Sequence, residues 1–441
     1  MEMLNLGEKL VIDESIEEYE YHEHVPDSGN MKLNQGGEIR IPINAEDTFL
    51  HISNSYLLFD GQLVNNNGVV ITDANTAAKK EYTTLINNAL MFLFSEIKYE
   101  LSGQTIEQIA NPGETTTMMG TLRYTEAFEK SLGMNQGWCG ERMWDPKGGL
   151  ERRYAAITTK SNPKGYFSFS IPLKHIFGFV ETYDKVMFGF KHQLSLYRKS
   201  SDQDAIIKKT TTITDSVATH KQEMVDSCKV RLDKLSWFIP HVLPSLENKV
   251  KLMKEIESKT NYEVGYKMLQ SETISVPQTT HFDWRLSVKS SPEKPRYIVI
   301  GFQNTGKVNF DKATFDHLNL KNIFVYLNSR RYPKIDYEID FEKNQYSRLF
   351  KEAATFKEKY YGLDELLSSV NLTRFEYKDH YPLFVIDVSK QSDKIKNGVT
   401  DIRVKAFFAE NAPANANAYA VLISDKIVTF KSDGSKFSVI Q

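Results

Sequence analysis

In many stretches of this chain, apolar and polar residues alternate along the sequence. This pattern constrains the fold more than any other feature. The stretch GEIRIPIN places Ile39, Ile41 and Ile43 on one face, and residues 165–173 and 400–408 repeat the pattern. Because successive side chains of a strand point to opposite faces, such stretches are half-buried strands. Further strands are predicted at residues 55–64, 95–101, 186–197, 228–239, 280–289, 296–302, 322–327, 383–388 and 419–430.

Many strands separated by Gly, Pro, Asn and Asp turns favour β-sandwiches or barrels over βαβ units. At 441 residues, with 41% hydrophobic residues, the chain has material for two large cores. Pro240 and Pro244 are expected to stop a strand near the middle of the chain. The helix predicted after them has Ser245 as its cap. Its apolar stripe is Leu246, Val250, Met253 and Ile256.

Two other helical segments, residues 114–133 and 344–370, interrupt the strand pattern, and the second is expected to break at Gly362. Both are interpreted as insertions in loops of a β-sandwich, where insertions are tolerated. Their amides are therefore expected to exchange faster than those of residues 296–302.

Charge and cysteine content exclude several functions. The net charge is −2 and residues 13–24, DESIEEYEYHEH, are acidic, so no basic arm is present to bind nucleic acid. Cys139 and Cys228 are too isolated for a disulfide framework or a zinc site. No signal peptide is visible, and the longest apolar run near the N-terminus, residues 89–94, is too short to span a membrane.

Residues 301–307, GFQNTGK, copy the spacing of a phosphate-binding loop. Such a loop needs a hydroxyl after the lysine for Mg²⁺ and must open a helix. Here Val308 follows Lys307, and the chain continues into another run of β-forming residues. We interpret the segment as a turn between strands, and Lys307 is expected to have no nucleotide role.

Other candidate sites are weak. His22 and His24 are spaced to share a metal, but no third ligand is evident. Cys139 lies among glycines and tryptophans. An ordered loop anchored by Trp138 and Trp144, with Pro146 and Gly148-Gly149 turning the chain, explains the pattern better than a catalytic thiol does.

Asp336, Glu338 and Asp340 alternate and would line one face of a strand. Calcium accepts such oxygens, but a solvent-facing strand explains the carboxylates equally well. We therefore assign no catalytic, cofactor-binding or metal-binding residue, and expect a protein that is not an enzyme and has no cofactor.

Residues 294–333 closely resemble a segment of the double jelly-roll major capsid proteins of Polinton (Maverick) elements and adintoviruses. The likeness rests on RYIVIGFQ at 296–303 and FDHLNLKNIFVYLNS at 315–329, followed by Tyr332-Pro333. WFIPHV before the central helix and PLFVIDVSKQ near residue 385 also look like this family.

The resemblance implies an all-β protein of two tandem eight-stranded jelly rolls with short helical insertions. The expected organisation is an acidic arm at 1–30, a first jelly roll at 31–244, a linker helix at 245–260 and a second jelly roll at 261–441. Such a chain would form homotrimeric, pseudo-hexagonal capsomers that tile an icosahedral shell around double-stranded DNA.

The further expectations are a separate penton or minor capsid protein, location in the virion, synthesis in the host cytoplasm, no sequence-specific nucleic-acid binding and no transmembrane segment. Three alternatives remain open: a carbohydrate-binding β-sandwich protein, a domesticated capsid-derived host protein, and an NTPase or hydrolase that uses residues 301–307 or Cys139.

Overall fold

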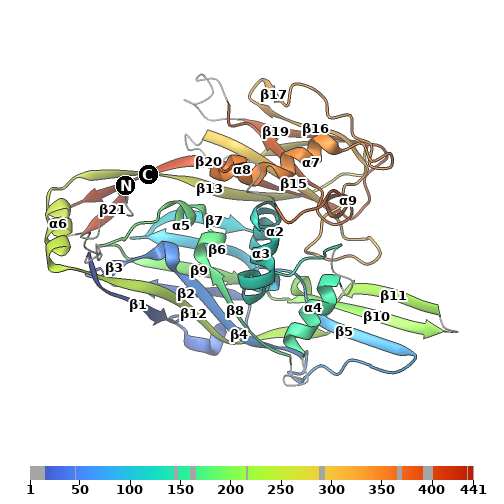
Figure 1. Cartoon of the computed structure of the whole chain (residues 1–441), viewed down its shortest axis with the longest axis horizontal. Coiled ribbons are helices and arrows are strands. Elements are labelled where there is room, and N and C mark those ends of the chain that lie inside the picture. The colour runs from blue at the N-terminus through green and yellow to red at the C-terminus, as the bar shows by residue number, and fades with distance from the viewer. Residues whose placement is uncertain are drawn as a thin grey trace, which may run out of the picture.

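The computed structural model describes residues 15–44, 46–143, 148–158, 165–214, 217–287, 294–364, 370–390, 401–434 and 436–440. Over these residues the chain forms two β-sandwiches that lie side by side (Figure 1). Helix α2 (Pro112–Arg123) lies between them, and α6 (Leu246–Glu257) connects them at one end of the long axis.

The first sandwich has two antiparallel sheets. One runs in the order β1 (Ile16–His24), β12 (Cys228–Pro244), β4 (Tyr56–Asn65), β8 (Tyr166–Pro172), with β3 (Phe49–Leu50) also paired to β12. The other runs β2 (Gly37–Ile43), β9 (His192–Arg198), β6 (Phe94–Leu101), β7 (Gln104–Ala110).

The second sandwich is built in the same way. One sheet runs β13 (Asn261–Ser275), β20 (Ala416–Ser432), β15 (Lys294–Asn304), β18 (Leu383–Asp387), with β21 (Phe437–Ile440) on β20. The other runs β14 (His281–Leu286), β19 (Ile402–Phe408), β16 (Leu320–Leu327), β17 (Arg330–Tyr332).

The two sandwiches share one connectivity. When the eight strands of the two facing sheets are counted along the chain, one sheet has the order 1-8-3-6 and the other 2-7-4-5, in both sandwiches. This is the strand order of a jelly roll. The prediction of two tandem eight-stranded jelly rolls is therefore confirmed.

The remaining elements lie outside the four sheets of the two jelly rolls. A small sheet of order β11-β10-β5 projects from the first jelly roll (Figure 1) and comprises β5 (Lys79–Leu85), β10 (Ile206–Thr214) and β11 (Val217–Met224). The other helices are α1 (Ala89–Phe92), α3 (Glu126–Phe128), α4 (Gly148–Ile157), α5 (Gly178–Thr182), α7 (Ser347–Ala354), α8 (Phe356–Tyr361) and α9 (Arg374–Asp379). Among the described residues, no helix combines the length and apolar character needed to cross a membrane.

The predicted strand alternation matches burial closely. Ile39, Ile41 and Ile43 of β2 are all buried, and the intervening Arg40 and Pro42 are exposed. β19 repeats this pattern. The hydrophobic effect therefore fixes the register of these strands, because a slip by one residue would expose the whole apolar set.

Both predicted helical insertions occupy the same connection, between the fifth and sixth strands of their jelly roll. Helices α2, α3 and α4 lie between β7 and β8, and α7, α8 and α9 lie between β17 and β18. Gly362 ends α8 in the left-handed conformation with φ 68°, as predicted. All twelve residues of α2 are buried between the jelly rolls, which argues against the faster amide exchange expected for this insertion.

The central prolines do not stop the strand that precedes them. β12 continues through Pro240 to Pro244 and pairs with β1 over this stretch. A proline removes only a donor, and the Pro240 carbonyl still accepts the His51 amide at 3.0 Å.

The acidic segment is also more than an arm. Residues 16–24 form β1, which pairs with β12 from Pro244 to Trp237, so the first jelly roll begins before residue 31. The backbone ladder defines this edge strand, since nearly all its side chains are exposed. The linker helix α6 lies within residues 245–260, and β13 starts at Asn261.

Two further strand predictions fail. Residues 335–340 are irregular, and Glu338 has φ 52°, so its carboxylate does not share a strand face with those of Asp336 and Asp340. Residues 186–191 precede β9, which begins only at His192.

Candidate functional site at the junction of the two jelly rolls

The segment that copies the spacing of a phosphate-binding loop, residues 301–307, leads into a turn. Gly301 lies in β15, where a Cβ would meet the Phe315 ring at 2.6 Å, so packing explains this glycine. Lys307 forms an ion pair with Asp316 at 2.9 Å, and the Val308 side chain is 81% exposed. No helix opens within residues 305–319, all of which the structure describes, so the turn provides no helix N-terminus for a phosphate.

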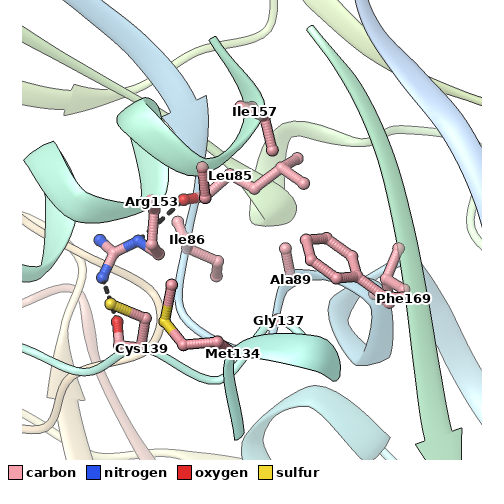
Figure 2. A pocket seen from close by; sticks show the side chains of 11 residues that line it. Leu85, Ile86, Ala89, Met134, Gly137, Cys139, Arg153, Ile157 and Phe169 are labelled. Atoms are coloured by element: carbon pink, nitrogen blue, oxygen red, sulfur yellow. Dashed lines mark hydrogen bonds between the residues drawn. The ribbon is translucent and has the colours of Figure 1, made fainter. Parts of the chain in front are cut away.

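Cys139 is buried beside a small cavity of about 30 Å³ (Figure 2). Its Sγ lies 3.7 Å from the Gly149 carbonyl oxygen, and its own carbonyl accepts a hydrogen bond from Arg153 at 2.6 Å. Burial raises the pKa of the Cys139 thiol, which disfavours the reactive thiolate. Trp138 is buried, as expected for an anchor, whereas Trp144 and Pro146 lie outside the described residues.

The histidine pair on β1 meets a residue that the sequence did not indicate. The His22 ring stacks on His241 of β12 with centroids 3.9 Å apart, and His24 Nε2 lies 3.2 Å from His241 Nε2. Burial, and then the neighbouring imidazoles, lower the pKa of His241 to about 4. A search of the described residues finds no three His, Cys, Asp or Glu side chains arranged to hold a metal ion.

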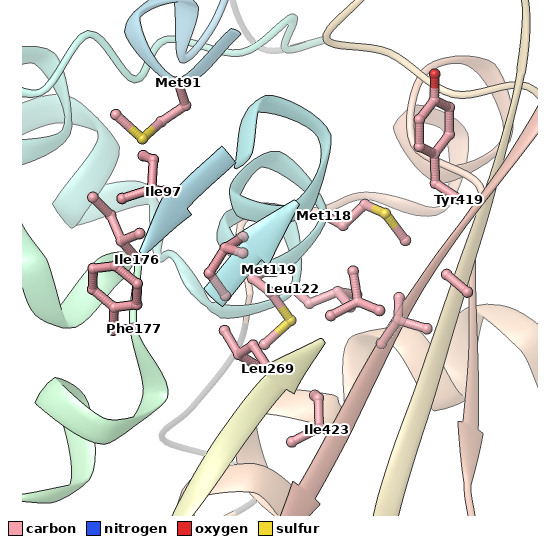
Figure 3. Packing of buried hydrophobic residues seen from close by; sticks show 14 of the residues in the cluster. Met91, Ile97, Met118, Met119, Leu122, Ile176, Phe177, Leu269, Tyr419 and Ile423 are labelled. Atoms are coloured by element: carbon pink, nitrogen blue, oxygen red, sulfur yellow. The ribbon is translucent and has the colours of Figure 1, made fainter. Parts of the chain in front are cut away.

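The densest set of buried polar groups lies instead where the two jelly rolls meet. Helix α2 begins at Pro112, after Asn111 in the left-handed conformation, and carries small residues where other elements approach closely. A Cβ on Gly120 would lie 2.6 Å from the Trp138 ring. Figure 3 shows Met119 and Leu122 of this helix together with Leu269 and Ile423 from two strands of the second jelly roll.

At the C-terminal end of α2, an ion pair within the first jelly roll contacts the second. Arg123 Nη1 lies 3.0 Å from both carboxylate oxygens of Glu181 on α5. Glu181 also accepts hydrogen bonds from the hydroxyls of Tyr360 and Tyr361, the last two residues of α8. Although burial opposes its charge, the Glu181 carboxylate raises the pKa of Arg123 well above its usual value. The guanidinium therefore stays charged, and the hydroxyls of Tyr360 and Tyr361 join the pair to the second jelly roll.

A second buried ion pair lies in the segment after α3 and is contacted by residues in and just before α9. Arg142 contacts fully buried Glu129 at 2.7 Å, and Asn371 donates to the same carboxylate at 2.9 Å. Glu376 of α9 accepts the Met143 amide at 2.7 Å while it also completes a capping box with Thr373. The Glu376 carboxylate therefore caps the N-terminus of α9 in the second jelly roll and also binds a backbone amide in a loop of the first.

A third contact joins α2 to β20 through a lysine. Lys312 Nζ lies 3.0 Å from Glu114 of α2 and donates to the Tyr419 hydroxyl of β20 at 2.9 Å. Burial opposes the charge on Lys312, but the nearby Glu114 carboxylate dominates and raises its pKa above the usual value.

The closest approach of the two jelly rolls occurs at β13. Glu107 of β7 accepts the Leu269 amide at 2.8 Å and the Phe179 amide at 2.9 Å. A Cβ on Gly178 would lie only 1.7 Å from the Lys267 carbonyl oxygen, so this position requires glycine. Burial raises the pKa of Glu107 to about 7, against the opposing effect of its amide donors.

These groups form no arrangement of nucleophile, base and oxyanion donors. They fix the orientation of one jelly roll against the other, because each network includes a buried hydrogen bond or ion pair across the junction. Sequence reasoning missed all of them, since the partners are separated by up to 242 residues along the chain. The one local signal was the disruption of strand alternation over residues 114–133.

The comparisons with known proteins agree with this architecture. Residues 83–428 match the model of the double jelly roll-like domain family. No curated protein sequence matches the chain.

Among solved structures, the chain is similar to the VP54 protein of the virus PBCV-1, fitted into a reconstruction of the virophage Sputnik. The TM-score is 0.58 at 9% identity, and the match covers 98% of this chain and 99% of that one. The Sputnik virophage structure gives a TM-score of 0.55 at 10% identity, with 99% and 91% covered. The Faustovirus major capsid protein gives a TM-score of 0.53 at 8% identity, with 96% and 92% covered.

At these identities the structural matches speak to the fold alone. The family model, in contrast, spans well over half of the chain and most strands of both sandwiches. The chain therefore belongs to the double jelly roll-like domain family.

Proposed function

We propose that this chain is the major capsid protein of a virus or virus-like element, and that its role is structural and not enzymatic. The observation that carries the proposal is the pairing of two jelly rolls with identical strand order, held in one orientation by buried polar contacts across their junction. Three such chains around a threefold axis present six similar units. A trimer of this kind has the pseudo-hexagonal outline needed to tile a shell.

Two further observations support this role. The similar solved structures are, by their own descriptions, a major capsid protein of Faustovirus, the PBCV-1 protein VP54 and the virophage Sputnik. In addition, the edge strand β1 exposes Ile16, Tyr19 and Tyr21, each at 40% or more. Exposed aromatic and aliphatic side chains on a sheet edge are suited to contacts between subunits.

The proposal extends to the particle. Homotrimers associate through weaker contacts into an icosahedral shell around a double-stranded DNA genome, and a separate penton or minor capsid protein closes the vertices. The acidic side chains of β1, among them Glu17, Glu18 and Glu20, are exposed and would repel a phosphate backbone. We therefore assign genome loading to another component.

The sequence resemblance at residues 294–333 favours a Polinton, Maverick or adintovirus lineage. The site of action is then the virion, after synthesis in the host cytoplasm. A domesticated capsid-derived protein would keep the same trimer.

Native mass spectrometry and negative-stain imaging of the purified chain test the proposal. We expect a homotrimer that persists on dilution, because obligate interfaces typically bury roughly 2,000 Å² or more, and pseudo-hexagonal particles of uniform size. Tyr19→Lys combined with Tyr21→Lys should weaken the association of chains, whereas Lys80→Glu on the projecting sheet serves as a surface control. A persistent monomer across salt and pH would overturn the capsid assignment.

A further inference from the structure

Two histidines from different strands meet at the edge of the first jelly roll. His24 ends β1, and His241 lies near the C-terminal end of β12, the strand that pairs with β1 (Figure 1). The Nε2 atoms of the two rings lie 3.2 Å apart, and the ring planes are within 19° of each other. Both side chains are half-buried, so solvent still reaches the pair.

This spacing is close to that of two ligands of one metal ion. Zn²⁺ binds imidazole nitrogens at about 2.0–2.1 Å, so two such nitrogens in a tetrahedral site lie roughly 3.3 Å apart. The rings of His24 and His241 already face each other through Nε2. Small rotations of the two side chains would therefore aim both nitrogens at one ion, which would replace the hydrogen bond between the rings.

Both imidazoles are held in the neutral form that binds metal ions. Burial, and then the neighbouring imidazoles, lower the pKa of His241 to about 4. Burial, and then the imidazole of His22, lower the pKa of His24. Only a neutral ring has a free nitrogen lone pair, so the two residues can bind a metal ion at neutral pH without first losing a proton.

The surroundings of the pair suit a cation. Glu20 lies directly opposite His241 in the ladder of β1 and β12, so its exposed carboxylate adds negative charge nearby. The His22 ring stacks on His241 with centroids 3.9 Å apart. Among the described residues no three His, Cys, Asp or Glu side chains surround a common ion, so water would fill the remaining positions. Imidazole ligands suit Zn²⁺, Cu²⁺ and Ni²⁺.

We propose that Nε2 of His24 and Nε2 of His241 bind one divalent transition-metal ion such as Zn²⁺. The ion joins residues that are 217 positions apart and ties the edge strand β1 to β12. This link adds to the backbone ladder, which otherwise holds a strand whose side chains are nearly all exposed. The inference concerns the first jelly roll alone and does not depend on assembly into shells.

Calorimetric titration of the full chain with ZnCl₂, after metals are removed with EDTA, tests the site. We expect wild type to bind one Zn²⁺ per chain. His24→Phe and His241→Phe should each weaken the affinity at least about tenfold, since loss of even an outer-shell partner costs about 10–100-fold. His22→Phe is the matched control, because it keeps an aromatic ring beside His241 and removes no ligand. Its affinity should equal that of wild type.

Three results of the titration would overturn the proposal. Wild type that binds no Zn²⁺ lacks the site. Unchanged affinity in both His24→Phe and His241→Phe would mark the zinc as an adventitious ion only, and an equal loss in His22→Phe would assign the ligands to a different pair. Native mass spectrometry adds a further check, because association of chains on addition of Zn²⁺ that His24→Phe abolishes would place the ion between copies.

A second measurement needs no substitution. The amides of residues 16–24 should exchange more slowly when Zn²⁺ is bound, because the ion stabilises only the paired form of β1. At a hundredfold excess of free Zn²⁺ over its dissociation constant, protection should rise by up to about a hundredfold. The edge strand β11 is the internal reference, and its exchange should not change. Equal protection of β1 with and without Zn²⁺ would show that no ion ties β1 to β12.

Discussion

Glu107 of β7 accepts the backbone amide of Leu269 of β13 at 2.8 Å, so a buried carboxylate of the first jelly roll holds a strand of the second. The same carboxylate accepts the Phe179 amide at 2.9 Å. It therefore fixes three elements at once, at the point where the two jelly rolls come closest.

This contact predicts a pH dependence of stability. Burial raises the pKa of Glu107 from 4.5 to about 7. A folded pKa above the unfolded value means that the contribution to stability is full below pH 4.5 and is lost as the pH rises to 7. Relative to Glu107→Gln, the wild-type free energy of unfolding should fall by about 3 kcal/mol over this range.

Denaturant titrations of both proteins at several pH values measure the difference. The free energy of unfolding of the exposed Glu20→Gln variant should change with pH in the same way as that of wild type. A difference between wild type and Glu107→Gln that does not change with pH would show that the buried carboxylate does not titrate in this window.

Gly178→Ala should separate the two jelly rolls. The added Cβ would lie 1.7 Å from the Lys267 carbonyl oxygen, and backbone atoms on both sides must move. We expect a loss of about 3 kcal/mol or more in the free energy of unfolding. Gly265→Ala is the matched control, because a Cβ there meets no atom within 4 Å. Equal stability of the two variants, measured by thermal unfolding, would contradict the close approach.

Glu181→Met should be strongly destabilising. Arg123, whose side chain is 3% exposed, would lose its carboxylate partner, and a buried pair broken in this way costs about 3–5 kcal/mol. Asp233→Ala removes the partner of Arg231 in an exposed pair and should cost about 1 kcal/mol or less. Chemical denaturation of the two variants gives the comparison, and similar losses would argue against a structural role for Arg123 and Glu181.

His192 predicts sensitivity to acid in the first jelly roll. Burial lowers the pKa of this histidine to about 3, and its Nδ1 lies 2.8 Å from the Tyr99 hydroxyl. A depressed folded pKa means that stability is full above pH 6.5 and is lost as the pH falls towards 3. Wild type should therefore lose about 2–3 kcal/mol from this group between pH 6.5 and 4.5.

His192→Phe should remove that dependence, at a cost of about 1–3 kcal/mol at pH 7 for the unpaired Tyr99 hydroxyl. The exposed His281→Phe variant should change neither value. Unfolding curves at pH 7 and 4.5 give both the cost of the substitution at pH 7 and the loss of stability in acid. If His192→Phe loses as much unfolding free energy as wild type between pH 7 and 4.5, groups other than His192 cause the loss.

Hydrogen exchange should place α2 among the most protected parts of the chain. All twelve of its residues are buried between the jelly rolls, as are most residues of the core strand β15. Mass-spectrometric exchange should give similar protection for the two elements. Exchange of α2 near the rate of the projecting strand β11, whose first residues are exposed, would mean that the junction opens readily.

The sequence by itself determined the strands whose side chains alternate. Burial on one side of a pleated strand gives the apolar residues of the sequence a period of two. This period predicted the buried face of the strands that contain Ile39, Ile41 and Ile43, or Phe167 and Ile171. The turn character of residues 301–307 was also readable, since Val308 offers no oxygen and no helical pattern follows. Gly362 marked a helix end because the left-handed conformation there suits glycine.

Only the tertiary structure decided the rest. β1 has no buried stripe, so its place in the sheet follows from hydrogen bonds to β12, more than 200 residues away. Helix α2 is buried on all sides and carries no amphipathic signal that would separate it from a loose insertion. Glu107, Arg123 and Glu129 resemble surface charges in the sequence. Glu107 meets the Leu269 amide only when the two jelly rolls pack together, and the pairs Arg123–Glu181 and Arg142–Glu129 form between segments that only the fold of the first jelly roll brings within hydrogen-bond distance.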